Sequence, residues 1–563
     1  MKKVIINGSL SLLLIIIAGS CQKSFLDVTP QASLTGQLLA NKSGLDKLLV
    51  AAYAALDGCT IGETTVAWRS SFANWLYGDV ASDNALKGSE ITDQPEMNPI
   101  EYWRDLTPDN TYMTTLWRAV YEGVARANSV LQVLKLAKNL NTTDANRIKG
   151  EALFLRAHYY FLGKRYFNML PYIDENVTDF RIPNDKDIWP NIEKDFLDAI
   201  SLLPLEPASP GSAHLNAAKA GLAKAYLFEK KYDLAKPLLD DIINSKRYIL
   251  WPNFYDNWNT ANEGKTTNTE AIFQIQNSLN DAGVRENGKT LYLSGIAQIQ
   301  GCCGFNQPSQ DLVNSFKTDA SGLPMLDTYS NTDLPSDDGL KSSDPFTPPT
   351  NSLDPRLDHT VGRRGIPYLD FGIFPGADWV VDQTTYGPYR LKKGQSTSAQ
   401  EAVTGVNSRT TVNYNIYRFA DILLMRAEVA VELNDLPTAL ILVNKIRERA
   451  RTGEVVKFSN GTPAANYNIK PYLVFPSQDY ARKAVRFERR LELAMEGDRL
   501  YDLIRWGVLK EVLTKYFINE GKRRPLMRAS AQYKADYLPI PTTEIDLSRD
   551  DKGNPTLKQN PNY

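Results

Sequence analysis

The sequence has few of the residues that build metal sites and nucleophilic active sites. Its three histidines, His158, His214 and His359, lie far apart, and none has the spacing of a zinc-binding pair. No G-x-S-x-G elbow occurs, so serine-nucleophile chemistry has no local support. We therefore expect neither a metal nor a cofactor. A glycoside hydrolase stays open, because its two carboxylates are usually distant in sequence.

An excess of one charge is also lacking. The 64 Lys and Arg residues balance 65 Asp and Glu residues, and the formal net charge is −1. No long run of one sign occurs, so the chain offers no electrostatic footprint for nucleic acid. Beyond the N-terminus, no segment has the roughly 20 apolar residues that a membrane-spanning helix needs.

The N-terminus has the pattern of a lipoprotein signal peptide. Met1-Lys2-Lys3 forms a short positive region, and an apolar stretch ends in small residues just before Cys21. We expect removal of residues 1–20, lipid attachment at Cys21, and a mature protein of residues 21–563 held to a membrane by its acyl chains. The alternative is an ordinary secretory signal with an incidental cysteine.

Three further cysteines remain in the exported chain: Cys59, Cys302 and Cys303. In an oxidising compartment, Cys302 and Cys303 could close on each other as a vicinal disulfide, or one of them could reach Cys59. We favour the first pairing, which leaves Cys59 as a small buried apolar residue. The flanking Gly301 and Gly304 would let the rigid ring lie exposed as an apolar platform, although a buried structural pair is the alternative.

Helical periodicity dominates the first half of the chain. The pattern predicts helices over residues 37–57, 110–139, 144–167 and 189–203. We therefore expect a mostly α fold with an N-terminal helical part over about 37–245 and a loop-rich C-terminal part over about 250–563.

Two helix pairs are related by a shift of 204 positions. The segment at 213–244 aligns with 417–449, so that Ala223 falls on Ala427 and Ala235 on Ala439. Small residues at helix crossings followed by a tight turn are similar to tetratricopeptide repeats. Because the copies are not in tandem, we expect a stacked helical platform and not an open solenoid.

Three segments have loop composition, at 58–108, 250–310 and 318–412, with a short strand predicted at 271–276. Loops this long usually bind something. Aromatic rings attract the C–H face of a sugar, and polar side chains bind its hydroxyls. The candidate ligand-binding residues are Trp75, Trp103, Tyr386, Asp83, Asn84, Arg390, Cys302 and Cys303, with Trp68, Trp258 and Trp379 as further exposed-loop candidates. Half-buried packing is the alternative for each tryptophan.

The densest charge cluster lies at 486–507. Arg489 and Glu492, Glu496 and Arg499, and Asp502 and Arg505 are each three residues apart, so we expect them to pair along helix faces. This spacing favours a structural ion network over a catalytic site.

Several segments together resemble the SusD/RagB family of outer-membrane glycan-binding lipoproteins. They are Phe25-Leu26-Asp27, GDVASDN at 78–84, ALFLRAHYYFLGKRYFNMLPYI at 152–173, AAKAGLAKAYL at 217–227, YRFADILLMRAEVAVE at 417–432, VNKIRERA at 443–450, FERRLELAMEGDRLYDLIRWG at 487–507, and YLPIPTTEI with QNPNY near the C-terminal end. The acidic cluster often found after the lipidated cysteine is absent here, since Cys21 is followed by Gln-Lys-Ser-Phe.

The resemblance implies tetratricopeptide-like helical pairs with long ligand-binding loops. It also implies a non-catalytic cell-surface lipoprotein of the outer membrane that captures oligo- or polysaccharide and passes it to a partner TonB-dependent transporter. Balanced charge favours a neutral glycan, such as a fructan or another plant polysaccharide. The alternatives are a lipoprotein glycoside hydrolase and a relative that captures peptides.

The sequence generates one test of the candidate residues. Trp103→Ala, or the double change Cys302→Ser and Cys303→Ser, should abolish glycan binding and leave the melting temperature nearly unchanged if these side chains contact ligand. Titration of the glycan into each variant, with a thermal melt beside it, measures both quantities. Unaltered affinity in both variants would remove these positions from the site.

Overall fold

The computed structural model describes residues 36–58, 67–258, 269–277, 296–300, 303–399, 412–529 and 535–563. The signal peptide and Cys21, Cys59 and Cys302 lie outside these residues. Within the described ranges, no helix combines the length and the apolar character needed to cross a membrane.

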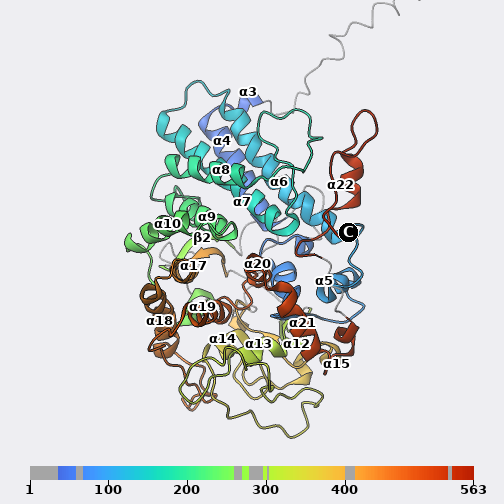
Figure 1. Cartoon of the computed structure of the whole chain (residues 1–563), viewed down its shortest axis with the longest axis vertical. Helices are drawn as coiled ribbons and strands as arrows, with labels where there is room; N and C mark the ends of the chain where they lie inside the picture. Colours follow the sequence, from blue (N-terminus) through green and yellow to red (C-terminus); the bar gives the residue numbers. More distant parts are fainter. Residues whose placement is uncertain are drawn as a thin grey trace, which may run out of the picture.

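Most of the long helices form one stack. Its members are α3 (Gly36–Leu39), α4 (Lys42–Ala54), α6 (Thr111–Leu134), α7 (Thr142–Phe167), α8 (Trp189–Leu202), α9 (Leu215–Phe228), α10 (Tyr232–Asn244), α17 (Phe419–Glu432), α18 (Leu436–Thr452) and α19 (Gln478–Glu492). From α6 onward each helix packs on the next, and Figure 1 shows the stack running from the top down the left side. The helices predicted at 110–139, 144–167 and 189–203 are confirmed with shifted ends, whereas the one predicted at 37–57 is divided into α3, α4 and a short turn at 55–57.

Polar caps start several of these helices where the sequence turns from loop to helix. The Asn110 side chain accepts from the backbone N–H of Tyr112 at the start of α6, and Asn141 accepts from Asp144 at the start of α7. Ser477 does the same for Tyr480 at the start of α19. Each cap satisfies a backbone donor that has no partner within the helix.

The shift of 204 positions holds in three dimensions. Ala223 and Ala427 are both fully buried, and the turns between the paired helices carry Lys230 at φ 59° and Asn434 at φ 60°, which are equivalent positions. α10 packs directly on α17 although residues 245–418 intervene. The chain therefore has the predicted platform of tetratricopeptide-like pairs, with a long insertion between the two copies.

The short elements lie in the connecting segments and after the stack. They are η1 (Ala55–Asp57), η2 (Ala67–Arg69), η3 (Trp75–Val80), η4 (Pro95–Met97), α5 (Asn98–Tyr102), η5 (Phe254–Trp258), α12 (Ala297–Gln300), α13 (Gln310–Ser315), α14 (Arg356–Thr360), η7 (Ala377–Trp379), α15 (Gln383–Tyr386), α20 (Arg499–Arg505), α21 (Leu509–Glu520), η8 (Pro525–Ala529) and α22 (Thr542–Leu547). Figure 1 shows the inserted segment, with α12 to α14, gathered below the stack.

Three two-stranded antiparallel ladders join segments that are distant in sequence. β1 (Ala85–Gly88) pairs with β3 (Phe305–Pro308), β2 (Ala271–Ile275) with β6 (Tyr414–Arg418), and β4 (Val361–Gly362) with β5 (Arg390–Leu391). The strand predicted at 271–276 is confirmed as β2. Its partner β6 leads straight into α17, so this ladder returns the insertion to the stack.

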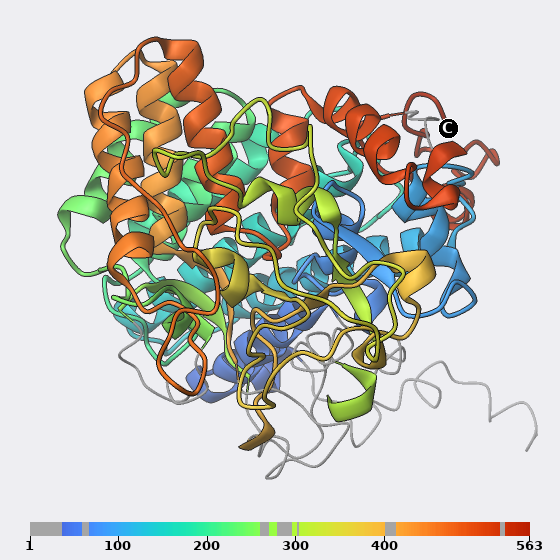
Figure 2. The ribbon, with the colours of Figure 1, turned by 90° about the horizontal axis from the view of Figure 1, so that it is seen from below.

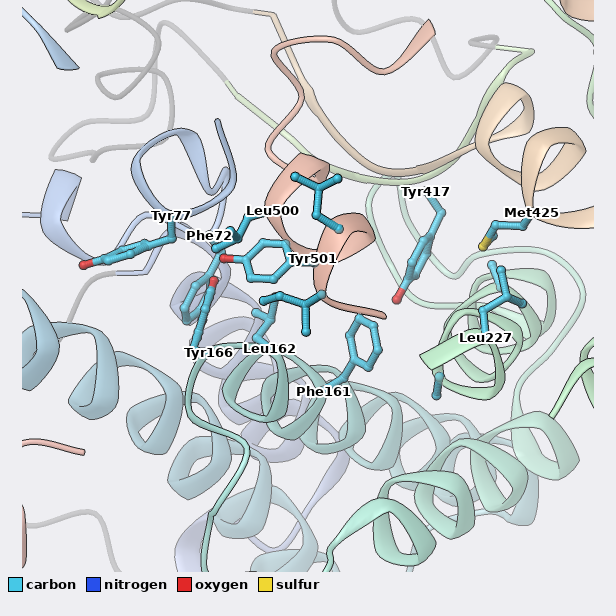
Figure 3. Close-up of a cluster of buried hydrophobic side chains, with 14 of the residues drawn as sticks. Phe72, Tyr77, Phe161, Leu162, Tyr166, Leu227, Tyr417, Met425, Leu500 and Tyr501 are labelled. Atoms are coloured by element: carbon cyan, nitrogen blue, oxygen red, sulfur yellow. The ribbon is translucent and has the colours of Figure 1, made fainter. Parts of the chain in front are cut away.

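A cluster of tyrosines joins the stack to the C-terminal helices. The ring of Tyr166 on α7 lies 5.8 Å from Tyr77 on η3 and 5.8 Å from Tyr501 on α20. Figure 3 shows these three side chains among their neighbours. The hydroxyls of Tyr166 and Tyr501 both donate to the Asn74 side chain. One buried amide oxygen thus satisfies two hydroxyls where three parts of the chain meet.

Two buried glutamates on α19 connect the insertion to the stack. Glu492 pairs with Arg356 of α14 at 3.1 Å, with Arg418 of β6 at 2.7 Å, and with Arg449 of α18. Glu488 pairs with the same Arg356 at 2.7 Å and with Arg447 of α18 at 2.9 Å. We call these residues the α19 ion network.

The charge cluster at 486–507 is structural, as its spacing predicted, but most of its partners are distant. Only the predicted pair Asp502–Arg505 forms, at 2.8 Å. Glu492 and Glu496 pair with arginines outside the cluster, and Arg499 pairs with Asp83. The prediction of two further pairs within the cluster was wrong, because these side chains point into the core, where buried charges need several partners.

The α19 ion network predicts an acid-sensitive stability. Burial raises the pKa of Glu492, but its three arginines outweigh burial and bring the pKa far below its usual range. Since the folded pKa lies below the unfolded value of about 4.3, this carboxylate stabilises the fold above that pH and the stabilisation is lost as the pH falls. We expect Glu492→Gln to lower the free energy of unfolding by about 3–5 kcal/mol at pH 7, measured by urea denaturation.

Glu448→Gln is the matched control, because Glu448 on α18 forms an exposed pair with Arg451. Its loss should cost less than about 1 kcal/mol. The two variants should also differ in pH dependence, since only Glu492→Gln removes part of the decline in stability below pH 4. Equal effects of both substitutions would contradict a central position for Glu492.

Candidate functional site

The tryptophans and the tyrosine predicted to bind ligand are buried. Trp75 and Trp103 are each 4% exposed and Tyr386 is 1% exposed, so the expectation that they lie on the surface is wrong. The segment at 67–108 has loop composition, but its short helical turns pack inward against the stack and β3. Aromatic content in a loop-like segment did not distinguish a folded inner layer from a projecting loop.

Trp103 and Trp75 have structural partners. Trp103 Nε1 donates to the carbonyl of Ala81 at 2.8 Å, and the Trp75 ring lies 5.9 Å from the ring of Phe305 on β3. Both side chains belong to the main core cluster. They therefore hold the segment at 67–108 in place and do not reach solvent.

Asp83 and Asn84 are buried partners of the C-terminal motif. Asp83 accepts from Arg499 Nε at 2.7 Å and pairs with Arg490 at 3.0 Å, while the Asn84 amide oxygen accepts from Arg490 at 3.2 Å. Burial raises the pKa of Asp83, but Arg490 and Arg499 outweigh it and lower the pKa to about 2. Both side chains are fully enclosed. The prediction that they contact ligand at the surface is therefore wrong.

Arg390 is buried beneath the segment that carries Cys303. Its guanidinium donates to the carbonyl of Gly304 and, at 3.4 Å, to the side chain of Gln307. Burial lowers its pKa to about 10. Arg390 is 1% exposed, so the prediction of an exposed ligand contact is wrong here as well. It positions the start of β3 instead.

Four rings next to this segment form a second, small core. Tyr368, Phe371, Phe374 and Trp379 pack with Ile296 and Ile299, separately from the main core. The Trp379 ring lies 5.4 Å from Phe374 and 6.0 Å from Tyr368, nearly perpendicular to Phe374. We call this group the aromatic loop cluster. Trp379 and Phe371 are half-buried, so part of the cluster faces solvent.

Cys303 packs against the edge of the main core cluster. It is half-buried and disulfide-bonded. The next residue, Gly304 at φ 95°, packs against Val381, where an added Cβ would come within 2.9 Å of the valine side chain. Since Cys302 and Cys59 lie outside the described residues, the pairing of Cys303 stays a prediction. Cys303 packs against the main core cluster and Trp379 belongs to the aromatic loop cluster, and both side chains are half-buried.

Polar groups occur at the edge of the aromatic loop cluster. The exposed Asp370 accepts from the Ser398 hydroxyl at 2.6 Å and from two backbone N–H groups at 398 and 399. Burial raises the pKa of Asp370, but the hydrogen bonds from Ser398 outweigh it and lower the pKa. A ring surface beside a charged acceptor suits a ligand that has both C–H faces and hydroxyls.

Sequence reasoning missed most of this cluster. Tyr368, Phe371 and Phe374 stand among Gly, Pro and Asp, and the density of rings between 368 and 379 was the signal that could have found them. His158 and His214 are buried and His359 is half-buried, and desolvation lowers the pKa of His158 to about 3 and those of His214 and His359 to about 4. Across the described ranges, no group of three or more His, Cys, Asp or Glu side chains is arranged to hold a metal ion.

Comparisons with known families match both halves of the chain. A family model described as the SusD family matches residues 269–563, and one described as "Starch-binding associating with outer membrane" matches residues 24–227. The SusD-like protein P38 of Formosa agariphila is 25% identical over 528 residues, which are 90% of this chain and 93% of that protein.

Solved structures share the fold along nearly the whole chain. A SusD superfamily protein from Bacteroides vulgatus has a TM-score of 0.69 at 21% identity, covering 93% of this chain and 100% of that one. Surface glycan-binding protein A from Bacteroides thetaiotaomicron, in complex with laminarihexaose, has a TM-score of 0.63 at 21% identity, covering 92% and 99%. At these identities the likeness establishes the architecture.

The burial of Trp103 reverses the outcome that the sequence alone predicts for Trp103→Ala. Removing a buried ring and its hydrogen bond should lower the free energy of unfolding by about 3–5 kcal/mol. Trp379→Ala should cost less, because Trp379 is half-buried in a small cluster. Thermal or urea unfolding of the two variants side by side tests the ranking, and a Trp103→Ala protein as stable as the parent would contradict the buried position.

Proposed function

The chain belongs to the SusD family, and from that premise we propose that it is a non-catalytic cell-surface lipoprotein that captures oligo- or polysaccharide. It passes the glycan to a partner TonB-dependent transporter of the outer membrane. Two findings support the proposal. The N-terminal half matches a family model described as starch-binding and associated with the outer membrane, and a fold neighbour was solved with laminarihexaose.

The observation that carries the proposal is the half-buried Trp379 on the aromatic loop cluster. Its ring is held by Tyr368 and Phe374, so its orientation is fixed before ligand arrives. A preformed ring loses little conformational entropy when a sugar stacks on it. Gly304, which follows the disulfide-bonded Cys303, packs against Val381, two residues after Trp379.

The surroundings of Trp379 favour a neutral sugar. Asp370 is already bonded by Ser398 and by backbone N–H groups, and it remains an acceptor for hydroxyls. Arg390, the nearby buried cation, is turned toward the Gly304 carbonyl and does not reach the surface. Hydroxyl recognition on a ring platform therefore explains the site better than recognition of a charged group.

Lipid attachment at Cys21 would complete the proposed function. The residues between Cys21 and Gly36 would link the lipid to α3, where the stack begins. A tether of this length keeps the glycan site at high effective concentration near a transporter while allowing the protein to move. The protein would then act as a capture lid at the outer face of the outer membrane.

Glycan titration of the soluble form, residues 22–563, tests the proposal. After a glycan array identifies a ligand, Trp379→Ala should weaken its affinity about tenfold, which corresponds to the loss of about 1.4 kcal/mol expected for one aromatic contact. Trp189→Ala is the matched control, because Trp189 is a half-buried tryptophan on α8 of the stack, packed on Phe161 and Phe228. It should bind like the parent.

Two results would overturn the proposal. New reducing ends appearing at enzyme-like rates would identify a glycoside hydrolase. Binding of peptides and of no glycan would identify a peptide-capturing relative. An equal affinity of parent and Trp379→Ala for the glycan would keep glycan capture but remove the aromatic loop cluster as its site.

A further inference from the structure

A cavity of 220 Å³ lies between α19, α20 and α21 and the segment at 326–329. In Figure 2 the orange and red helices of this region lie along the upper face, and the yellow-green α12 lies at the lower edge. Because α12 contacts η7, which ends at Trp379, the aromatic loop cluster is near that lower edge. The cavity is therefore separate from the aromatic loop cluster. Its volume falls below the roughly 300 Å³ at which pockets for drug-sized ligands begin, so it suits a single ring.

The floor of this cavity is electrically neutral. Arg490 and Arg499 line it, and both are paired with the buried carboxylate of Asp83. Arg490 also pairs with Asp311 at 2.8 Å. Because both arginines are paired with buried carboxylates, neither is available to a ligand.

Arg486 in the wall lacks such a partner. Its nearest carboxylate, on Glu432, is 3.9 Å away, and its buried Nε has no hydrogen-bond partner among the described residues. Burial lowers its pKa, with Glu428 and Glu432 only partly opposing the effect. The neighbouring Arg505 is different, because both of its terminal nitrogens donate to Glu428.

The mouth of the cavity adds further positive charge. Lys515 lies with its Nζ 5.6 Å from the Tyr329 ring, and Glu511 is the one acidic side chain of the lining outside the paired floor. Lys483 pairs with the exposed Asp327 at 2.7 Å. Glu432 beside Arg486 is already paired with Arg482 at 2.8 Å. Among the lining residues, Arg486 and Lys515 therefore stand against the single carboxylate of Glu511, which leaves one net positive charge for a ligand to neutralise.

Aromatic side chains supply the remaining surface. The Arg486 guanidinium lies 4.8 Å from the Trp506 ring, and the Arg505 guanidinium lies 4.9 Å from the same ring. Tyr329 and Phe487 contact each other at 5.4 Å between ring centroids. Tyr516 also lines the cavity, and its hydroxyl is buried.

We infer that this cavity binds one acidic sugar residue, with its carboxylate or sulfate between Arg486 and Lys515 and its ring against Trp506 and Tyr329. A planar guanidinium can bind a carboxylate or a sulfate through two parallel hydrogen bonds. The sugar part of this assignment rests on the proposed function, whereas the anion part rests on the cavity alone.

The experiment uses the soluble chain of residues 22–563 and two probes, methyl glucuronide and glucose 6-sulfate, titrated by NMR or calorimetry at low salt. The variant Arg486→Gln with Lys515→Gln should lose at least about tenfold in affinity for the preferred probe, as expected for one charge-assisted hydrogen bond. Lys510→Gln on α21 is the control, since Lys510 is exposed and outside the cavity lining. Neutral methyl glucoside should not bind here.

The two probes distinguish carboxylate recognition from sulfate recognition, and the controls distinguish failure of this inference from failure of the proposed function. The probe with the higher affinity identifies carboxylate or sulfate as the recognised group, and raising the salt should weaken its binding. Binding of neither probe by a parent protein that still binds glycans through Trp379 would overturn this inference and keep the proposed function. Equal displacement of both probes by inorganic sulfate alone would overturn the sugar assignment and leave a simple anion site. Probe binding that is unchanged in the double variant would show that this cavity is not the binding site.

Discussion

The buried carboxylates of Glu488 and Glu492 constrain the rest of the structure. A carboxylate that loses water must be surrounded by cations and donors, and no single arginine compensates it fully. Arg356 comes from the insertion, Arg418 from the strand that ends it, and Arg449 from α18. The insertion between the two helix pairs is therefore fixed to α19 by charge, in addition to apolar packing. Its loops can be long because their bases are anchored.

The same requirement explains why motif residues turned out to be enclosed. Asp83 and Asn84 stand in a segment of loop composition, yet they pair and hydrogen-bond with Arg490 and Arg499, which lie more than four hundred positions later in the sequence. An arginine buried in this way needs acceptors from another part of the chain, and a loop can supply them without a helix of its own. Dense charge in the sequence indicated the network correctly, while its geometry depended on tertiary contacts.

The sequence predicted what depends on local period and missed what depends on long-range partners. Helix periodicity placed α6 to α10, and the shift of 204 positions found the second pair down to the matching turns at Lys230 and Asn434. Spacing within one helix correctly predicted the Asp502–Arg505 pair. It did not predict the ion pairs that these helices form with distant segments. For the site, a tryptophan in a polar segment has the same local sequence whether the segment folds inward, as at Trp103, or faces solvent, as at Trp379.

The rigid bases of the loops also decide where recognition can occur. Arg390 and the β1–β3 ladder hold the residues around Cys303, and the aromatic loop cluster packs against that base without joining the main core. Trp379 is consequently both fixed in orientation and open on one side, a combination that a fully buried ring and a freely moving loop each lack. The opposite face has its own fixed geometry, because the neutral floor of Arg490, Arg499 and Asp83 supports a wall in which Arg486 stays under-compensated. Because the other cations are paired within the fold, the described residues that line that cavity carry a net positive charge.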